Sequence, residues 1–268
     1  LLGTFGVIVF SIFLNHDATS ASILERQDAF KNVILFFSGI IAFIGLMVFF
    51  FMRTNINEGV LQSKSDLSYK NIFTVLKLES VWLLMIIIMC AYFGYKVTDI
   101  YSLYASDILG YDEVKAANIS SLQLYLRPIA CILIGFMADR YNGPLWIIIG
   151  FLTMFLGSLL FASGILISGQ FFLFAISLII LAFGTYAIRA LYFAVLKEAN
   201  IPLALTGTAV GVISLAGYTP DIFGGPLMGF FLDKFPGIKG HQYVFGILAL
   251  LSIFGLFASL RFAKITLK

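Results

Sequence analysis

The stretch Arg127-Pro-Ile-Ala-Cys-Ile-Leu-Ile-Gly-Phe-Met-Ala-Asp-Arg-Tyr-Asn-Gly143 sets an arginine in apolar sequence and ends on Gly135-x-x-x-Asp139-Arg140. A second stretch, Asp221-Ile-Phe-Gly-Gly-Pro-Leu-Met-Gly229-Phe-Phe-Leu-Asp233-Lys234, has the same design. In both, a charged residue stands eight positions before a glycine, and Asp followed by a basic residue begins four positions after that glycine. An internal repeat of whole helix groups is typical of secondary transporters.

The composition is that of a polytopic membrane protein. Hydrophobic residues make up 60% of the chain and charged residues 12%, and the mean hydropathy is +1.01, which excludes an ordinary soluble domain. A helical span needs about 20 apolar residues. Eight segments approach or reach that length, the first of them short: 1–14, 32–52, 81–104, 117–138, 145–167, 171–196, 204–232 and 243–260.

Five residues of the first stretch resemble the cytoplasmic loop signature that the major facilitator superfamily carries between its eighth and ninth helices. They are Gly135, Ala138, Asp139, Arg140 and Tyr141. Gly225-Pro226-x-x-Gly229 is similar to the Gly-Pro packing motif of the same family. Asn142 departs from the pattern at a usual glycine position. The resemblance implies an all-α helix bundle that works as a uniporter, symporter or antiporter.

The loops predict how the chain is organised. The longest polar break is 53–80, and in the resembled family a long cytoplasmic loop joins two six-helix domains. We therefore expect a fragment with the end of the N-terminal bundle (helices 5 and 6) at 1–52, the inter-domain loop at 53–80 and a complete C-terminal bundle (helices 7–12) at 81–268. With the first span leaving outward, the inner loops hold nine Lys and Arg and the outer loops five, which agrees with the positive-inside rule.

Five charged residues fall inside the predicted spans. At about 2.5–3.5 kcal/mol each near a helix centre, five unpaired charges would oppose insertion by roughly 12–18 kcal/mol, so we expect them to face protein or water. They lie on the seventh, eighth, tenth and eleventh helices, which line the central cavity of the resembled fold. The five are Lys96, Asp99, Arg127, Arg189 and Asp221.

Helical spacing places polar partners on each charged face. The four faces are Tyr92/Lys96/Asp99, Ser120/Gln123/Arg127, Thr185/Arg189/Tyr192 and Ser214/Tyr218/Asp221. Three basic residues against two acids favour an organic anion. The predicted substrate-binding residues are Arg127 as the main clamp, Lys96, Tyr92, Gln123, Arg189 and Tyr218. Asp221 and Asp99 are the candidates for a coupling proton, and Gly135, Asp139 and Arg140 form the predicted gating motif.

Simpler interpretations stay open at each position. Lys96 and Asp99 would also form a local ion pair, Arg127 and Asp221 a structural bridge, and Arg189 would also reach the inner headgroups. A neutral, sugar-like solute or a transporter-like sensor is the alternative function. The only two histidines, His16 and His241, fall in predicted outer loops, and neither a metal motif, a phosphate loop nor a nucleophile–base pair is visible.

The expected partners follow from the same observations. We expect a multi-pass protein of the bacterial inner membrane that works as a monomer in the lipid bilayer. Its partners would be a small solute and a coupling proton or ion. A net charge of +3 without a basic run gives no support for nucleic acid, and we expect neither enzymatic activity, a cofactor nor a metal.

Overall fold

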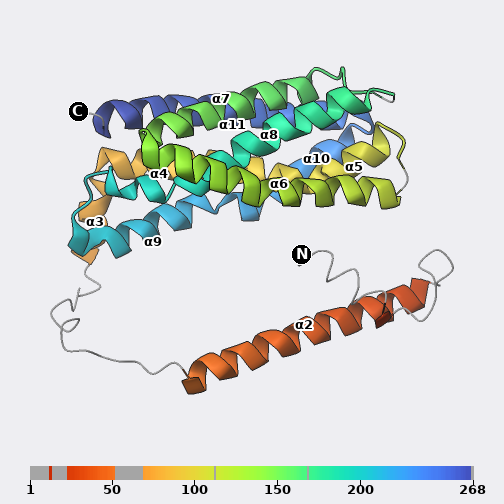
Figure 1. The fold of residues 1–268 in the computed structure, drawn as a ribbon, viewed down its shortest axis with the longest axis horizontal. Helices are drawn as coiled ribbons and strands as arrows, with labels where there is room; N and C mark the ends of the chain where they lie inside the picture. The colour runs from red at the N-terminus through yellow and green to blue at the C-terminus, as the bar shows by residue number, and fades with distance from the viewer. Residues whose placement is uncertain (1–11, 14–22, 52–68, 112, 168, 267–268) are drawn as a thin grey trace. The chain divides into compact units, whose positions relative to one another are not determined.

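The computed structural model describes residues 12–13, 23–51, 69–111, 113–167 and 169–266. Every regular element in those ranges is a helix (Figure 1). Seven of these helices or helix pairs are long and apolar enough to cross a membrane, which confirms an all-α polytopic membrane protein. The expected span at 1–14 lies outside the described residues except for 12–13, and so does the part of the predicted loop at 53–68.

The chain divides into two compact units, Leu1–Lys64 and Ser65–Lys268. In the first unit, α2 (Ile23–Phe51) covers the predicted span at 32–52 as far as Phe51, the last described residue there, and begins earlier than predicted. The segment before the span is rich in good helix formers such as Leu, Glu, Gln and Lys, so the helix extends into what hydropathy assigned to a loop.

The second unit holds the other six membrane spans. A short helix precedes them, α3 (Tyr69–Leu76), in sequence that we expected to be loop. The indole N–H of Trp82 donates a hydrogen bond to the carbonyl of Leu76 at 2.7 Å and so caps the C-terminal end of α3. The six spans are built from α4 (Glu79–Val97), α5 (Tyr101–Asp107), α6 (Glu113–Arg140), α7 (Gly143–Ala162), α8 (Phe171–Leu191), α9 (Thr206–Gly217), α10 (Pro220–Lys234) and α11 (Ile238–Thr266).

The core of this unit lies where α7 packs against α8 and α11, and where α4 packs against α11, α9 and α8. Glycines allow the closest of these approaches. A Cβ atom on Gly184 of α8 would lie 2.7 Å from the carbonyl oxygen of Gly150 on α7. By contrast, a Cβ on Gly225 or Gly229 would meet nothing within 4 Å, so these two motif glycines pack against no other segment of the part of the chain that is described.

Two spans that we predicted as continuous helices are broken. The span at 81–104 divides into α4, a 3₁₀ turn (Thr98–Ile100) and α5. The span at 204–232 divides into α9 and α10, with the break between Gly217 and Pro220. Glycine is a common helix end, and proline has no N–H to donate to the preceding turn. The predicted span at 171–196 also ends early, at Leu191, before a 3₁₀ turn (Ala194–Lys197).

Candidate functional site

The two helix breaks place a cation at the C-terminal end of one helix and an anion at the N-terminal end of another. Lys96 lies in the last turn of α4, where the carbonyl end of the helix dipole favours a cation. Asp221 lies in the first turn of α10, where the free N–H groups favour an anion. The ammonium of Lys96 lies 3.6 Å from Oδ1 of Asp221, so the breaks in the two spans meet at this ion pair.

Lys96 is shared between two carboxylates, and we name Lys96, Asp99 and Asp221 the lysine–aspartate group. The local pair that the spacing allowed is present, with Lys96 Nζ 3.3 Å from Asp99 Oδ2. The hydroxyl of Tyr92 donates to Asp221 Oδ2 at 2.9 Å. The side chains of Lys96, Asp221 and Asp99 are 25%, 50% and 62% exposed, so the group stays open to water or solute.

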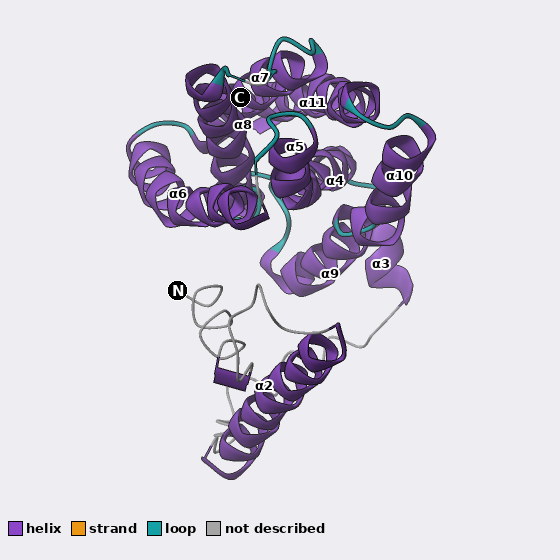
Figure 2. Ribbon diagram, turned by 90° about the vertical axis from the view of Figure 1, so that its right-hand side faces the viewer, coloured by secondary structure: helices purple, strands orange, loops and turns teal. Residues whose placement is uncertain are grey.

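Arg127 and Asp221 do not form the structural bridge that their positions in the repeat allowed. Among the described residues, the ion pair of Asp221 is with Lys96. The physical reason is the packing: α6, which carries Arg127, lies against α8 and α5, whereas α10 lies against α4 and α11. Figure 2 shows α6 and α10 on opposite sides of α4 and α5.

The two arginines converge on one tyrosine instead. The guanidinium carbon of Arg189 lies 3.8 Å from the ring centroid of Tyr95, and that of Arg127 lies 5.7 Å from the same centroid. We name Arg127, Arg189 and Tyr95 the arginine–tyrosine group. Arg189 also lies 5.3 Å from the ring of Tyr92, so it points into the bundle and not toward the headgroups.

Neither guanidinium of the arginine–tyrosine group has a carboxylate partner within the described ranges. Nη1 of Arg189 is buried and has no hydrogen-bond partner there. Buried polar groups are nearly always paired, so this donor is available to a bound group. Sequence reasoning missed Tyr95, because it lies one residue away from the charged face of its helix.

The two other predicted contact residues are already engaged with protein. Gln123 is 5% exposed. Its amide nitrogen donates to the carbonyl of Thr98 at 3.1 Å, and its amide oxygen accepts from the hydroxyl of Tyr186 at 3.3 Å. The ring of Tyr218 lies 4.7 Å from that of Tyr92. The hydrogen bonds of Gln123 hold α6 against the break after α4. The ring contact holds Tyr218 against Tyr92, beside the lysine–aspartate group.

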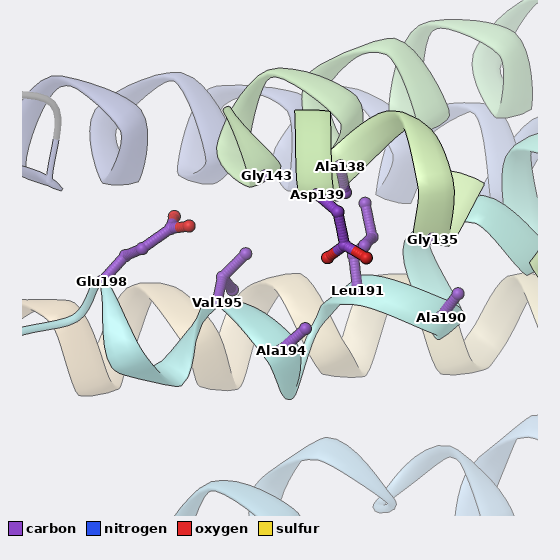
Figure 3. A pocket seen from close by; sticks show the side chains of 9 residues that line it. All are labelled: Gly135, Ala138, Asp139, Gly143, Ala190, Leu191, Ala194, Val195 and Glu198. Atoms are coloured by element: carbon purple, nitrogen blue, oxygen red, sulfur yellow. The ribbon is translucent and has the colours of Figure 1, made fainter. Parts of the chain in front are cut away.

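Two of the three residues of the predicted gating motif, Gly135 and Asp139 but not Arg140, line a pocket of about 460 Å³ at the end of α6 (Figure 3). Gly135 and Asp139 form one side, and Glu198 lies across from them beside Gly143. Burial raises the pKa of the Glu198 carboxyl. Asp139 forms neither an ion pair nor a hydrogen bond with another described residue, and Arg140 lies 6.0 Å from the Tyr141 ring. The gating role therefore stays a prediction.

The position that we predicted for His241 is wrong. The helix α11 begins at Ile238 and not at the apolar run, so His241 lies inside it and is fully buried. Its Nε2 lies 3.2 Å from Oδ2 of Asp107 at the end of α5, and the ring of Tyr104 packs edge-on against it at 5.0 Å. The pair joins α5 to α11, and hydropathy alone does not detect a buried histidine at a helix start.

Comparisons with known proteins place this bundle in a cellular membrane. The chain is 27% identical over 277 residues to "Inner membrane protein YqcE" of Escherichia coli (strain K12), which covers 98% of the chain and 62% of that relative. It is 27% identical over 257 residues to "Inner membrane protein YihN" of the same organism, which covers 88% of the chain and 57% of that relative.

The chain thus spans about three-fifths of the length of the curated relatives it matches. No protein-family model matches it. The relatives and the seven candidate spans together show that the chain belongs to a multi-pass protein of the bacterial inner membrane.

Proposed function

We propose that the chain is part of a secondary active transporter that moves a small organic anion by alternating access. The observation that supports this function most is that three intramembrane charged residues meet at the breaks of two spans, while two arginines from α6 and α8 lie on the ring of Tyr95, next to Lys96 in the chain. Broken helices whose ends face a site at mid-depth are a recurring feature of secondary transporters. The motifs that resemble the major facilitator superfamily, around Asp139 and Pro226, support the same class.

The anion is favoured by the way the charges are distributed. Lys96 is offset by two carboxylates, whereas Arg127 and Arg189 have none in the described part of the chain. In this proposal the two arginines bind the solute, and Asp221 or Asp99 carries a coupling proton. Asp139 takes part in the inner gate. The protein would work as a monomer in the bilayer, without a cofactor, a metal or nucleic acid, and it would not be an enzyme.

One observation favours a neutral, sugar-like solute as the second candidate. The ion pairs of Lys96 with Asp99 and Asp221 are complete without any ligand, as structural pairs would be. Tyrosine rings such as those of Tyr92 and Tyr218 also pack well against a sugar. A transporter-like sensor would use the same residues to bind a solute without moving it.

The test is solute flux into liposomes that contain the full-length protein. Radiolabelled carboxylates and sulfonates are compared with neutral sugars, and an internal pH dye records proton movement. We expect saturable uptake of at least one anion that Arg189→Gln abolishes and that Lys234→Gln, a change at the far end of α10, leaves intact. Uptake of sugars alone would favour the second candidate, and binding without flux would favour a sensor.

A further inference from the structure

Two guanidinium groups share one aromatic platform inside the bundle, near the ends of α4 and α8. Tyr95 packs between α6 and α8, beside Ala130, Ala182 and Tyr186. Because the carbons of Arg189 and Arg127 lie 3.8 and 5.7 Å from its ring centroid, they can be no more than 9.5 Å apart, the sum of the two distances. The two guanidinium groups therefore lie beside one ring, within 9.5 Å of each other.

These two guanidinium groups have no carboxylate partner in the described part of the chain. Nη1 of Arg189 is buried without a partner in the described part of the chain. A guanidinium carries five N–H donors in a planar fork that matches the oxygens of an oxyanion. Stacking on the Tyr95 ring fixes the plane of the fork but uses none of its hydrogen atoms. The group is therefore oriented and lacks an acceptor.

We propose that Tyr95 holds Arg189 and Arg127 as a two-guanidinium site for the oxyanion head of a monoanionic organic solute, such as a carboxylate, sulfonate or sulfate ester. This inference rests on the proposed function, since it names the solute class of the same site. Arg189, which is the closer to the ring and has the buried free donor, makes the main contact.

The charges of the described residues around the site favour a solute with one negative charge. The two arginines contribute +2, and the lysine–aspartate group contributes −1 when both carboxylates are ionised. A monoanion brings the five residues and the solute to zero. A dianion leaves one uncompensated negative charge among these residues, so like-charge repulsion weakens its binding relative to a monoanion. Lys96 does not compensate for it, because Asp99 and Asp221 already lie 3.3 and 3.6 Å from its ammonium.

Two matched probes test the charge limit. Propyl sulfate is a monoanion at all accessible pH values, whereas propyl phosphate loses its second proton at about pH 6. Binding of each to the full-length protein in detergent is measured by titration calorimetry at pH 5.0 and pH 7.5. We expect similar affinities at pH 5.0, and a preference for the sulfate of at least tenfold at pH 7.5. Because both probes experience the same titration of the site, their ratio reports the charge of the ligand.

Variants test the residues. Arg189→Gln is expected to weaken propyl sulfate binding about ten- to a hundredfold. Tyr95→Phe, which keeps the ring, is expected to retain binding within about threefold, and Tyr95→Leu to lose about tenfold. Lys234→Gln is the control and is expected to bind like the unmodified protein. Retained binding in Tyr95→Phe with loss in Tyr95→Leu identifies Tyr95 as a positioning residue, because a loss of fold would affect both.

Three results would overturn the site: no binding of either ester, equal or tighter binding of the phosphate at pH 7.5, or normal binding by Arg189→Gln. These results are separable from those on the proposed function. Ester binding without flux would contradict the transporter and keep the site. Flux of a neutral solute without ester binding would contradict the site and keep the transporter.

Discussion

The lysine–aspartate group and the arginine–tyrosine group lie on neighbouring faces of one bundle and carry their charges in different ways. Lys96 has two carboxylates within 4 Å and lies at a helix end that favours it. Arg189 has an aromatic ring beneath it and a buried N–H that finds no acceptor among the described residues. The first group is neutralised by the protein to within one charge, and the second leaves two charges for a ligand. Charged residues that look alike in a hydropathy plot thus have separate tasks.

After Arg189, the largest effect is expected at Arg127, the other arginine of the unneutralised group. Arg127→Ala should weaken binding of propyl sulfate by roughly ten- to a hundredfold, since hydrogen bonds to charged groups contribute about 1.5–3 kcal/mol. Arg127→Lys should restore part of the affinity, because an ammonium lacks the planar fork. Calorimetry on the full-length protein measures both, with Arg261→Ala at the end of α11 as control. Unchanged binding in Arg127→Ala would leave Arg189 as the only arginine of the site.

Double-mutant cycles compare the two groups directly. Lys96→Met and Asp221→Leu should show a coupling of about 1–2 kcal/mol in the free energy of unfolding, because they remove the two sides of one ion pair. Arg127→Met and Asp221→Leu should be additive within about 0.5 kcal/mol. Denaturation in detergent gives the values. A coupling for Arg127 as large as that for Lys96 would mean that Asp221 bridges to α6 after all.

A smaller effect is expected from the tyrosine hydroxyls. Tyr92→Phe keeps the ring beside Arg189 and removes the hydrogen bond to Asp221, so it should destabilise the protein by about 1 kcal/mol. Tyr95→Phe is the matched control, because the Tyr95 hydroxyl makes no hydrogen bond with the described residues. Thermal unfolding measures both. Equal effects would show that the Asp221 carboxylate does not depend on Tyr92.

The smallest effect concerns Glu198, outside both groups. Burial raises its pKa, so the folded protein binds a proton more readily than the unfolded chain does. Stability from this residue is therefore present below the unfolded pKa of about 4.3 and is lost as pH rises through the folded pKa. Glu198→Gln should remove that loss and raise the melting temperature at pH 7 by less than about 2 °C. A variant that melts lower at pH 7 than the unmodified protein would contradict the role of burial.

Much of this site was predictable because helical spacing is regular. The i, i+4 and i, i+7 positions of Tyr92, Lys96 and Asp99 place them on one face, and the same pattern in the eleventh helix gives Tyr218 and Asp221. A charge in apolar sequence must find protein or water, so the membrane spans, the all-α class and the convergence of these residues followed from composition and period.

The remaining features depend on packing between helices, which a single sequence does not specify. Other helices pack against α4 on several sides. Tyr95 lies off the charged face of α4 but still contacts the arginine side chains of α6 and α8 for that reason. The partner of Asp221 depended on which helices are neighbours. The break between Gly217 and Pro220 does have a sequence signal, a glycine typical of a helix end followed by a proline typical of a helix start. The mean hydropathy of the whole segment does not detect this signal.

The broken spans also determine where water enters the protein. Each helix end leaves carbonyl groups without a partner in the helix, and lipid offers them none. At the Gly217–Pro220 break, near the middle of the span from Leu203 to Lys234, short turn hydrogen bonds such as that from the Thr219 N–H to the Ala216 carbonyl at 3.3 Å replace the helical ones, and such local turns open to water more readily than an unbroken helix does. Deuterium exchange of an unbroken membrane helix advances from its ends inward. Exchange in this span and in the one interrupted at Thr98 should instead begin in the middle and advance toward both membrane surfaces.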